Sequence, residues 1–407
     1  MVSVPKNNAP ALRFDKYSQP WRVTKNNHIF VPTDERGFAG LTVLSATQKD
    51  GLIPRSLLGK DISYNKDAEK IYKRVLPGDF AIHLRSFQGS FAHSKYEGIT
   101  SPAYTTFRLR QASQHDDLFW KYFFISQSFI QSLIKVTYGI RDGRSIGAEE
   151  YFLEDSCFPP TPEEQRAIGE LFADLDALIE QHRAKHTNLQ QTKTALMQRM
   201  FPQDGADEPE LRLGGFIGAW EPRIMRDCAE YSKGNGYSKK DIADEGTPVI
   251  HYGRLYTNYE TAITDVDTFA SPQPGALISR GDEVLVPASG ETAEDIAIAS
   301  ALLQSGVLIG GDLNVIRPRQ NIDPVFLALS LSHGMAKETL VKRAQGKSVV
   351  HLRNSDIQEV EILFPSLEEQ GAIGEVFTNL DALIAAEHRY ITQLTQAKTA
   401  LLQRMFV

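Results

Sequence analysis

Two copies of one 39-residue segment dominate this chain and restrict the folds open to it. The first copy covers residues 163–201, the second covers residues 368–406, and 24 of the 39 aligned positions are identical without a gap. Each copy follows a proline-bearing entry, at Phe158 and at Phe364, which suits the first turn of a helix and stops strand pairing. The sequence therefore predicts two long helices of the same kind.

Apolar side chains recur at heptad spacing along both copies, which is the pattern of a coiled coil. They are Ile168, Leu171, Leu175, Leu178, Leu189 and Leu196 in the first copy, and Ile373, Val376, Leu380, Leu383, Leu394 and Leu401 in the second. A helix of 39 residues is roughly 58 Å long, too long for a small domain unless it packs lengthwise on another helix. Because residues 203–361 separate the copies, we expect antiparallel pairing with one globular domain at each end.

Weaker similarity extends the repeat through the globular parts. The matching segments are Leu12-Arg13-Phe14 with Leu211-Arg212-Leu213, Trp21 with Trp220, Gly78-Asp79 with Gly281-Asp282, and Gly143-Arg144-Ser145-Ile146 with Gly346-Lys347-Ser348-Val349. The whole chain is thus a duplicated unit with a pseudo-twofold internal repeat.

Short β-rich runs around residues 249, 284 and 314 alternate with helical patterns at 116–134 and 324–344, so each globular part is predicted to be α+β. We expect four segments along the chain. They are a first domain at 1–157, a central helix at 158–202, a second domain at 203–361 and a C-terminal helix at 362–407.

The composition is that of a globular chain without a membrane span, with 42% hydrophobic and 23% charged residues. The two cysteines lie far apart in the sequence and no signal peptide is visible, which favours a cytoplasmic protein without disulfides. The net charge of −7 argues against a nucleic-acid partner, but residues 1–157 carry 21 basic against 16 acidic residues, a net charge of +5. Residues 202–363 carry 15 against 24, a net charge of −9, although their part from Arg317 to Arg353 is locally basic.

The duplicated helix, with its EEQ, AIG, LDALI and QRMF motifs, resembles that of the specificity subunit of type I restriction-modification systems. The GGDLNVIRP segment at 310–318 and the RAQGKSVVHL segment at 343–352 share the resemblance, which covers nearly the whole chain. It implies two target recognition domains that each read one half of a split, asymmetric double-stranded DNA site. It also implies helices that set the spacer and dock methyltransferase subunits, with motor-nuclease subunits as further partners.

Catalytic, cofactor and metal sites are not expected in this chain. The string from Ala344 to Ser348 resembles a phosphate loop but has Val341 where the motif requires glycine, and the amino-methylase tetrapeptide is absent from the sequence. His182 and His186 have metal-ligand spacing on one helix, but their counterparts in the second copy are Glu387 and Ile391. We therefore interpret the two histidines as a polar layer that fixes the register of the coiled coil.

DNA contacts are expected in loops where polar and basic side chains cluster beside glycine, since these groups reach both phosphates and base edges. In the first domain they are His83, Arg85, Ser86, Gln88, Tyr138, Arg141, Arg144 and Ser145. In the second they are Lys233, Asn235, Tyr237, Ser238, Lys239, Tyr252, Arg254, Ser289, Glu291, Thr292, Arg343, Gln345, Lys347 and Ser348. For any single residue, an ordinary solvated turn is an equally good interpretation.

One alternative from another functional class stays open. A coiled-coil scaffold whose globular domains bind protein partners would suit the acidic second half of the chain. DNA affinity should fall steeply with salt through counterion release, whereas a mostly apolar protein interface should respond weakly.

Overall fold

The computed structural model describes residues 8–47, 50–59, 66–83, 91–138, 145–203, 205–346 and 349–407. The chain divides into two compact units. Unit 1 comprises Met1–His182 with Tyr390–Val407, and unit 2 comprises Arg183–Arg389. The division falls inside the long helices, so the domain boundaries given above remain predictions.

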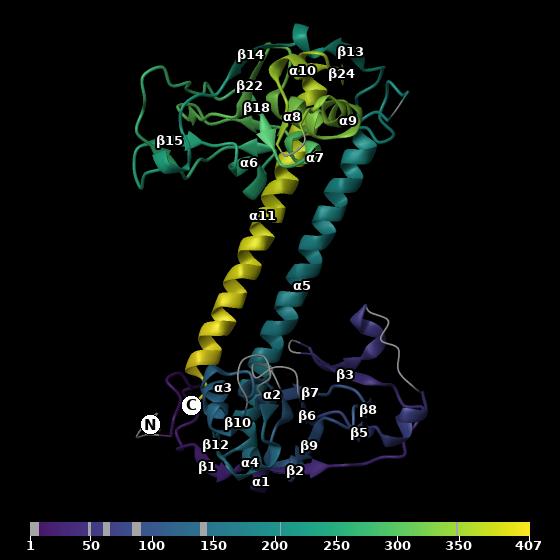
Figure 1. Ribbon diagram of the computed structural model, residues 1–407, viewed down its shortest axis with the longest axis vertical. Coiled ribbons are helices and arrows are strands. Elements are labelled where there is room, and N and C mark those ends of the chain that lie inside the picture. The colour runs from purple at the N-terminus through teal and green to yellow at the C-terminus, as the bar shows by residue number, and fades with distance from the viewer. Residues whose placement is uncertain are drawn as a thin grey trace. The chain divides into compact units, whose positions relative to one another are not determined.

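The two long helices are α5 (Pro162–Met200) and α11 (Leu367–Arg404). Pro162 at the start of α5 needs no amide partner, and both helices carry acidic residues in the first turn and an arginine in the last turn, where the helix dipole favours them. Each unit contains a stretch of both helices (Figure 1).

Contacts between α5 and α11 run in opposite directions along the two sequences. In unit 1, Asp176 accepts a hydrogen bond from Lys398, and the ring of His182 lies 4.5 Å from that of Tyr390. In unit 2, Lys185 forms an ion pair with Glu387, and Lys193 donates a hydrogen bond to Asp381 at 2.5 Å. The partner number falls as the α5 number rises, which confirms antiparallel pairing.

His182 and His186 both face the partner helix. His182 packs edge-on against Tyr390, and the ring of His186 lies 5.9 Å from that of His388. In the described residues, no group of three or more potential ligands that could hold a metal ion is found.

The globular part of unit 1 is built on a four-stranded antiparallel sheet with the order β2-β9-β6-β7. Two-stranded ribbons β1-β12, β3-β4, β5-β8 and β10-β11 surround it. The strands are β1 (Arg22–Lys25), β2 (Phe30–Thr33), β3 (Leu44–Thr47), β4 (Gly51–Pro54), β5 (Lys73–Val75), β6 (Phe80–Ile82), β7 (Phe91–His93), β8 (Gly98–Thr100), β9 (Thr105–Leu109), β10 (Thr137–Tyr138), β11 (Ser145–Ile146) and β12 (Asp155–Phe158). The helices are α1 (Asn26–Ile29), α2 (Asp117–Phe123), α3 (Gln127–Ser132) and α4 (Ala148–Leu153), with 3-10 turns at η1 (Arg55–Leu58), η2 (Lys66–Ile71), η3 (Ala112–Gln114) and η4 (Leu133–Val136).

The globular part of unit 2 contains a five-stranded mixed sheet with the order β14-β22-β18-β20-β16 and a three-stranded sheet with the order β17-β15-β21. Ribbons β13-β24 and β19-β23 complete it. The strands are β13 (Glu221–Ile224), β14 (Ala229–Lys233), β15 (Thr247–Ile250), β16 (Ala262–Ile263), β17 (Phe269–Ala270), β18 (Glu283–Pro287), β19 (Ser289–Gly290), β20 (Ser300–Leu302), β21 (Leu308–Ile309), β22 (Leu313–Pro318), β23 (Val350–His351) and β24 (Glu361–Phe364). The helices are α6 (Arg254–Thr257), α7 (Ala293–Ile296), α8 (Pro324–Ser332), α9 (Gly334–Arg343) and α10 (Asn354–Gln358), with 3-10 turns at η6 (Met225–Asp227) and η7 (Lys239–Asp241).

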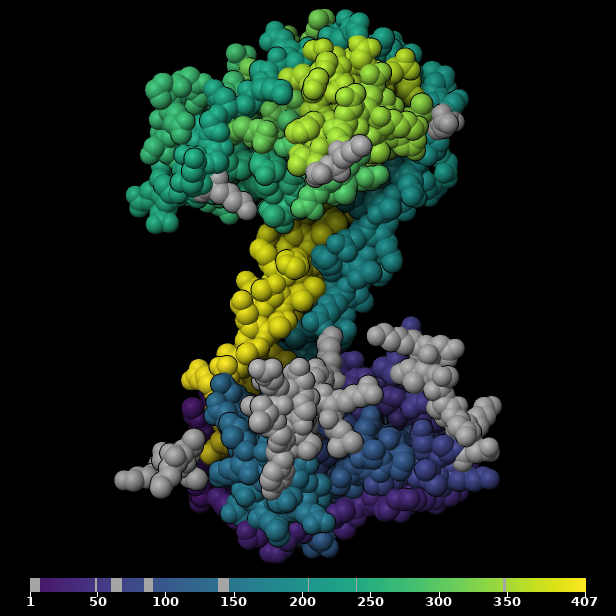
Figure 2. Space-filling model, viewed as in Figure 1, coloured from purple at the N-terminus to yellow at the C-terminus, as the bar shows by residue number. Residues whose placement is uncertain are grey.

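The chain from α8 to α10 gathers on one face of unit 2 and appears there in yellow-green (Figure 2). Helix α8 is buried on nearly every side because it packs between the five-stranded sheet and the ends of the long helices. Its side chains share one core with Met197 and Phe201 of α5 and its C-terminal end, and with Ile373 and Phe377 of α11. The corresponding core in unit 1 joins α2 to Ile168, Phe172, Met405 and Phe406.

A buried arginine–glutamate pair attaches each globular part to the helix that follows it. In unit 1, Arg13 donates two hydrogen bonds to Glu164, at 2.6 and 2.7 Å. In unit 2, Arg212 donates two to Glu369, at 2.8 and 2.7 Å. Both carboxylates are almost fully buried, so each guanidinium offsets the cost of removing a charge from water.

A glutamine follows each of these glutamates and completes the attachment. Gln165 accepts from the backbone N–H of Asp116 at 3.0 Å, and Gln370 accepts from that of Asp323 at 2.9 Å. Asp116 and Asp323 in turn cap the N-termini of α2 and α8. The repeat in sequence is therefore a repeat in contacts, which confirms the predicted fold class of tandem α+β domains with an antiparallel helix pair.

Candidate nucleic-acid interface

A cleft of about 780 Å³ opens in unit 2 between α6, the β19-β23 ribbon, α7 and α9. We call it the tyrosine cleft. Its lining consists of Tyr252, Leu255, Tyr256, Tyr259, Ser289, Gly290, Glu291, Glu294, Asp295, Ile298, Lys337 and Val349. The cleft thus combines three aromatic rings with carboxylates and one lysine, a composition that suits flat polar ligands.

The wall formed by β19 is held in place from two sides. Ser289 and Gly290 pair with His351 and Val350 of β23, and the Tyr256 hydroxyl donates to the Ser289 carbonyl at 2.7 Å. A Cβ atom on Gly290 would lie 2.5 Å from Ile296 Cγ2 and 2.9 Å from Tyr256 Oη, so this wall requires glycine.

Electrostatics keep the Tyr256 hydroxyl a donor. Burial, with a smaller contribution from the nearby carboxylate of Asp295, raises its pKa above the ordinary range, so the hydroxyl stays protonated at physiological pH. Burial also raises the pKa of Tyr259, whose hydroxyl donates to the Ala299 carbonyl at 3.3 Å. Both phenols therefore stay neutral.

Three of the predicted DNA contacts come together in this cleft. Tyr252, Ser289 and Glu291 line it, Tyr252 with 41% of its surface exposed. Thr292 comes next and precedes α7, and its hydroxyl caps that helix by accepting a hydrogen bond from the backbone N–H of Asp295 at 3.2 Å. Gln345 exchanges two backbone hydrogen bonds with His351 at the end of the same ribbon, at 3.0 and 2.8 Å.

Other predicted contacts in the second domain hold its loops together. Tyr237 is buried and its hydroxyl accepts from the backbone N–H of Gln273 at 2.8 Å. The side-chain amide of Asn235 donates to the Gly275 carbonyl at 2.7 Å, and the Ser238 hydroxyl donates to Asp241 at 2.8 Å.

Four predicted cations in that domain differ in their surroundings. Arg254 forms ion pairs with Asp267 at 2.6 Å and with Glu260 at 2.9 Å, so its charge is already balanced. Lys233 is exposed at the end of β14, and Arg343 is the last residue of α9. For Lys239 only the backbone, in η7, belongs to the described residues.

Several predicted contacts lie outside the described residues. They are Arg85, Ser86, Gln88, Arg141 and Arg144 in the first domain and Lys347 and Ser348 in the second. Tyr138 and Ser145 are described as backbone only, and they pair across the β10-β11 ribbon. His83 is nearly buried, with its ring 6.0 Å from that of Tyr104.

The cleft also contains residues absent from the predicted set, chiefly Tyr256, Tyr259 and Lys337. A signal for the aromatic residues was present in the sequence, because Tyr252, Tyr256 and Tyr259 follow one another at the i, i+4, i+7 spacing of one helix face. No comparable local pattern marks Lys337, which reaches the cleft from α9.

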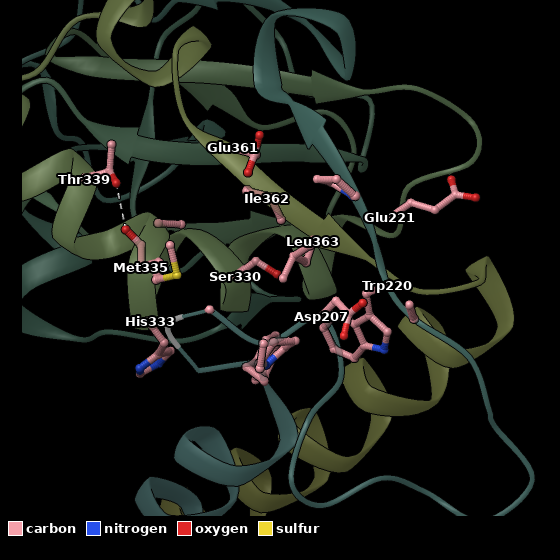
Figure 3. A pocket seen from close by; sticks show the side chains of 18 residues that line it. Asp207, Trp220, Glu221, Ser330, His333, Met335, Thr339, Glu361, Ile362 and Leu363 are labelled. Atoms are coloured by element: carbon pink, nitrogen blue, oxygen red, sulfur yellow. Dashed lines mark hydrogen bonds between the residues drawn. The ribbon is translucent and has the colours of Figure 1, made fainter.

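A second hollow in unit 2, of about 720 Å³, lies where the chain leaves α5 (Figure 3). Trp220, Met335, Ile362 and Leu363 give it apolar walls, and His333 lies at its edge in the view shown. Among the residues that the structure describes, none of the predicted DNA contacts lines it.

Comparison with known proteins shows what the chain is similar to. A model of the type I restriction modification DNA specificity domain matches residues 218–396, which include the tyrosine cleft. The type I restriction enzyme MjaVIII specificity subunit of Methanocaldococcus jannaschii is 23% identical over 320 residues, which cover 75% of this chain and 73% of that protein. Residues 218–396 thus match a type I DNA specificity domain, and the chain as a whole is similar to a type I specificity subunit.

Two solved structures from type I restriction-modification systems share the fold. The crystal structure of the type I restriction-modification S subunit from M. genitalium matches with a TM-score of 0.65 at 13% identity, covering 98% of this chain and 99% of that one. A chain from a structural study of assembly and conformational transition in a type I system matches with a TM-score of 0.51 at 20% identity, covering 95% and 98%.

Across the described residues, no helix is both long enough and apolar enough to cross a bilayer.

Proposed function

We propose that this specificity subunit recognises a bipartite double-stranded DNA target and does no chemistry itself. The observation that carries the proposal is the duplicated attachment of a globular part to a helix pair, through Glu164 in one unit and Glu369 in the other, in a chain that contains a DNA specificity domain. Two equivalent attachments that carry different globular parts suit a protein whose two domains each read a different half-site. The readers would be residues 1–157 and 203–361.

The tyrosine cleft is the proposed reading surface of the second domain. Tyr252, Ser289 and Glu291 line it, and Lys347 and Ser348 lie between Gln345 and the β23 strand in sequence. Aromatic, hydroxyl and carboxylate groups in one concavity can contact base edges, while Lys233, Arg343 and Lys347 supply charge for phosphates. In the first domain, we propose Arg141 and Arg144 for the same purpose.

The paired helices, residues 158–202 and 362–407, would act as the spacer between the half-sites and as the docking surface for methyltransferase subunits. Motor-nuclease subunits would join that complex, and the whole would work in the cytoplasm. Salt dependence separates this proposal from the protein-scaffold alternative, because the logarithm of DNA affinity falls linearly with the logarithm of the salt concentration.

Domain replacement tests the proposal. Residues 203–361 are exchanged for the matching domain of another specificity subunit, and the target is read by selection from a random DNA library with the methyltransferase-bound protein. One half of the target should change and the other half should persist. A change in both halves would refute independent reading, and a complex that selects no sequence would refute the proposed function.

The proposed role of the helices in setting the spacer length has its own test. One heptad inserted after Gln181 lengthens α5 by roughly 10 Å, equivalent to about three base pairs, and keeps the apolar seam in phase. The preferred gap between constant half-sites should grow by a few base pairs. If the variant folds and binds with the original gap, the helices do not set the spacer.

A further inference from the structure

Among the carboxylates of the tyrosine cleft, Glu291 has the most favourable position for reading a base. It is exposed, it lines the cleft, and it forms no ion pair or side-chain hydrogen bond with another residue of the described ranges. By contrast, Glu294 and Asp295 belong to the single turn of α7.

The backbone that carries Glu291 is fixed on both sides. Before it, Gly290 is paired to β23 and packed against Ile296 and Tyr256. After it, Thr292 caps α7. A side chain between two anchored residues loses little backbone freedom on binding, which is the property required of a specificity contact.

The charge of the cleft indicates which part of DNA it would face. Glu291, Glu294 and Asp295 line it against the single lysine Lys337. Three carboxylates repel the phosphate backbone, so a DNA duplex that enters the cleft would present base edges there and would place its phosphates on the basic residues outside. The aromatic ring of Tyr252 at the rim provides an apolar surface beside those edges.

An ionised carboxylate can only accept hydrogen bonds, and this restricts the base. In the major groove, only the amino groups of cytosine and adenine donate. Adenine carries the acceptor N7 beside its amino group, which would repel a carboxylate, whereas cytosine has no acceptor of its own beside N4 on the major-groove edge. We propose that Glu291 reads the amino group of a cytosine in the second half of the target.

This inference rests on the proposed DNA-reading function and is tested with the full-length chain in complex with methyltransferase subunits. Three variants are compared: Glu291→Gln, Glu291→Ala and, as a matched control for charge in the same cleft, Glu294→Gln. Each is used to select from a library in which the second half-site is random, after thermal melting shows that the variants fold like the parent.

We expect the parent to require cytosine at one position of the second half-site. Glu291→Ala should relax that position by about 10-fold to 100-fold, and Glu291→Gln should move its preference toward adenine, which a side-chain amide can bind through both N6 and N7. The first half-site and the other positions should be unchanged. Glu294→Gln removes a repelling charge from the same cleft, so it should raise affinity for all DNA sequences alike and keep the preference for cytosine.

Two outcomes would overturn the inference while leaving the proposed function intact. In one, both Glu291 variants bind DNA with the base preferences of the parent. In the other, Glu291→Gln and Glu294→Gln change the same positions equally, which would indicate a general effect of charge. If the parent complex selects no DNA sequence at all, the proposed function fails and this inference falls with it.

Discussion

The attachment in unit 1 and the attachment in unit 2 use the same ion pair but surround it differently. Glu164 accepts from Arg13 and also from the Trp21 indole at 3.2 Å, whereas Glu369 accepts from Arg212, and the matching indole of Trp220 has no hydrogen-bond partner in the described residues. The charged pair is therefore the common element of the repeat. The neutral hydrogen bond is a local addition that one unit does without.

A second difference between the units lies around the lysine–aspartate pairs that link α5 to α11. In unit 1, Asp176 accepts from both Lys398 and the Tyr122 hydroxyl, the latter at 2.7 Å. In unit 2, Asp381 accepts from Lys193, and its other oxygen is buried without a partner in the described residues. Each globular part thus completes the same helix contacts with its own side chains, and unit 1 completes them more fully.

Removing the carboxylates of Glu164 and Glu369 should have the largest effect on the stability of the two units. Glu164→Ala and Glu369→Ala each leave a mostly buried arginine unpaired, which typically costs about 3–5 kcal/mol. Glu164→Ala should cost unit 1 about 1 kcal/mol more than Glu369→Ala costs unit 2, because the Trp21 indole also loses its acceptor. Hydrogen exchange followed separately in each unit measures both values.

Glu164→Gln is the control for that pair, since it removes the charge and keeps an acceptor oxygen. It should destabilise unit 1 less than alanine does. Equal losses from Glu164→Ala and Glu369→Ala would show that the Trp21 hydrogen bond contributes nothing measurable.

Glycines of the long helices provide a smaller effect, which should differ between the two units. A Cβ atom on Gly169 would lie 2.8 Å from Leu118 Cβ and 2.8 Å from the Phe119 backbone nitrogen, so Gly169→Ala should destabilise unit 1 by about 1–3 kcal/mol. On Gly374 the same atom would lie 3.3 Å from Asp323 Oδ1 and from Val325 Cβ, and the strain should roughly cancel the better helix propensity of alanine.

Gly371→Ala is the matched control because nothing lies within 4 Å of its added methyl group. It should stabilise unit 2 by up to about 1 kcal/mol. Denaturant unfolding of the three variants ranks them, and a neutral Gly169→Ala would mean that α2 shifts freely on α5.

Helix α3 follows α2 in unit 1, and helix α9 follows α8 in unit 2. The residues that precede α3 and α9 should give the two units a different dependence of stability on pH. Ser126 caps α3 by accepting from the Phe129 backbone N–H, whereas His333 at the start of α9 makes no such bond. Burial, followed by the charges of Lys337 and Lys193, lowers the pKa of His333 from 6.5 to about 4.

The unfolded chain therefore binds a proton at this histidine between about pH 6.5 and pH 4, and the folded chain does not. Stability of unit 2 should fall as the pH falls through this window, by about 1 kcal/mol near pH 5.5. His333→Gln should reduce the slope of unfolding free energy against pH. An unchanged slope would show that the imidazole is protonated in the folded protein.

The sequence predicted the repeated framework well, because its signals are local and periodic. The two long helices and their antiparallel pairing are confirmed, with α5 at Pro162–Met200 and α11 at Leu367–Arg404. Of the predicted heptad positions, Leu383 is half exposed. The β-rich runs near 249, 284 and 314 are strands, and the helical patterns at 116–134 and 324–344 are helices.

The cleft was predictable only in part, because its walls come from segments distant in the chain. Polar residues beside glycine led to Ser289 and Glu291 but equally to Tyr237 and Asn235, whose polar atoms bond to their own loops. Composition cannot separate a side chain that faces a cleft from one that closes a turn, since both need hydrogen-bonding groups next to flexible backbone.

The smallest expected effect concerns base preference and comes from one hydrogen bond inside the tyrosine cleft. Tyr256→Phe removes only the hydroxyl that donates to the Ser289 carbonyl, a neutral hydrogen bond that contributes about 1 kcal/mol. Because this bond holds the strand before Glu291, its loss should loosen base preference by about 5-fold at the position that Glu291 reads and should leave the first half-site unchanged. Tyr252→Phe, whose hydroxyl makes no hydrogen bond within the described part of the chain, is the control and should keep that preference. Library selection with both variants gives the comparison. If Tyr256→Phe weakens binding to all sequences equally, then Tyr256 supports the fold of unit 2 and does not position the reader.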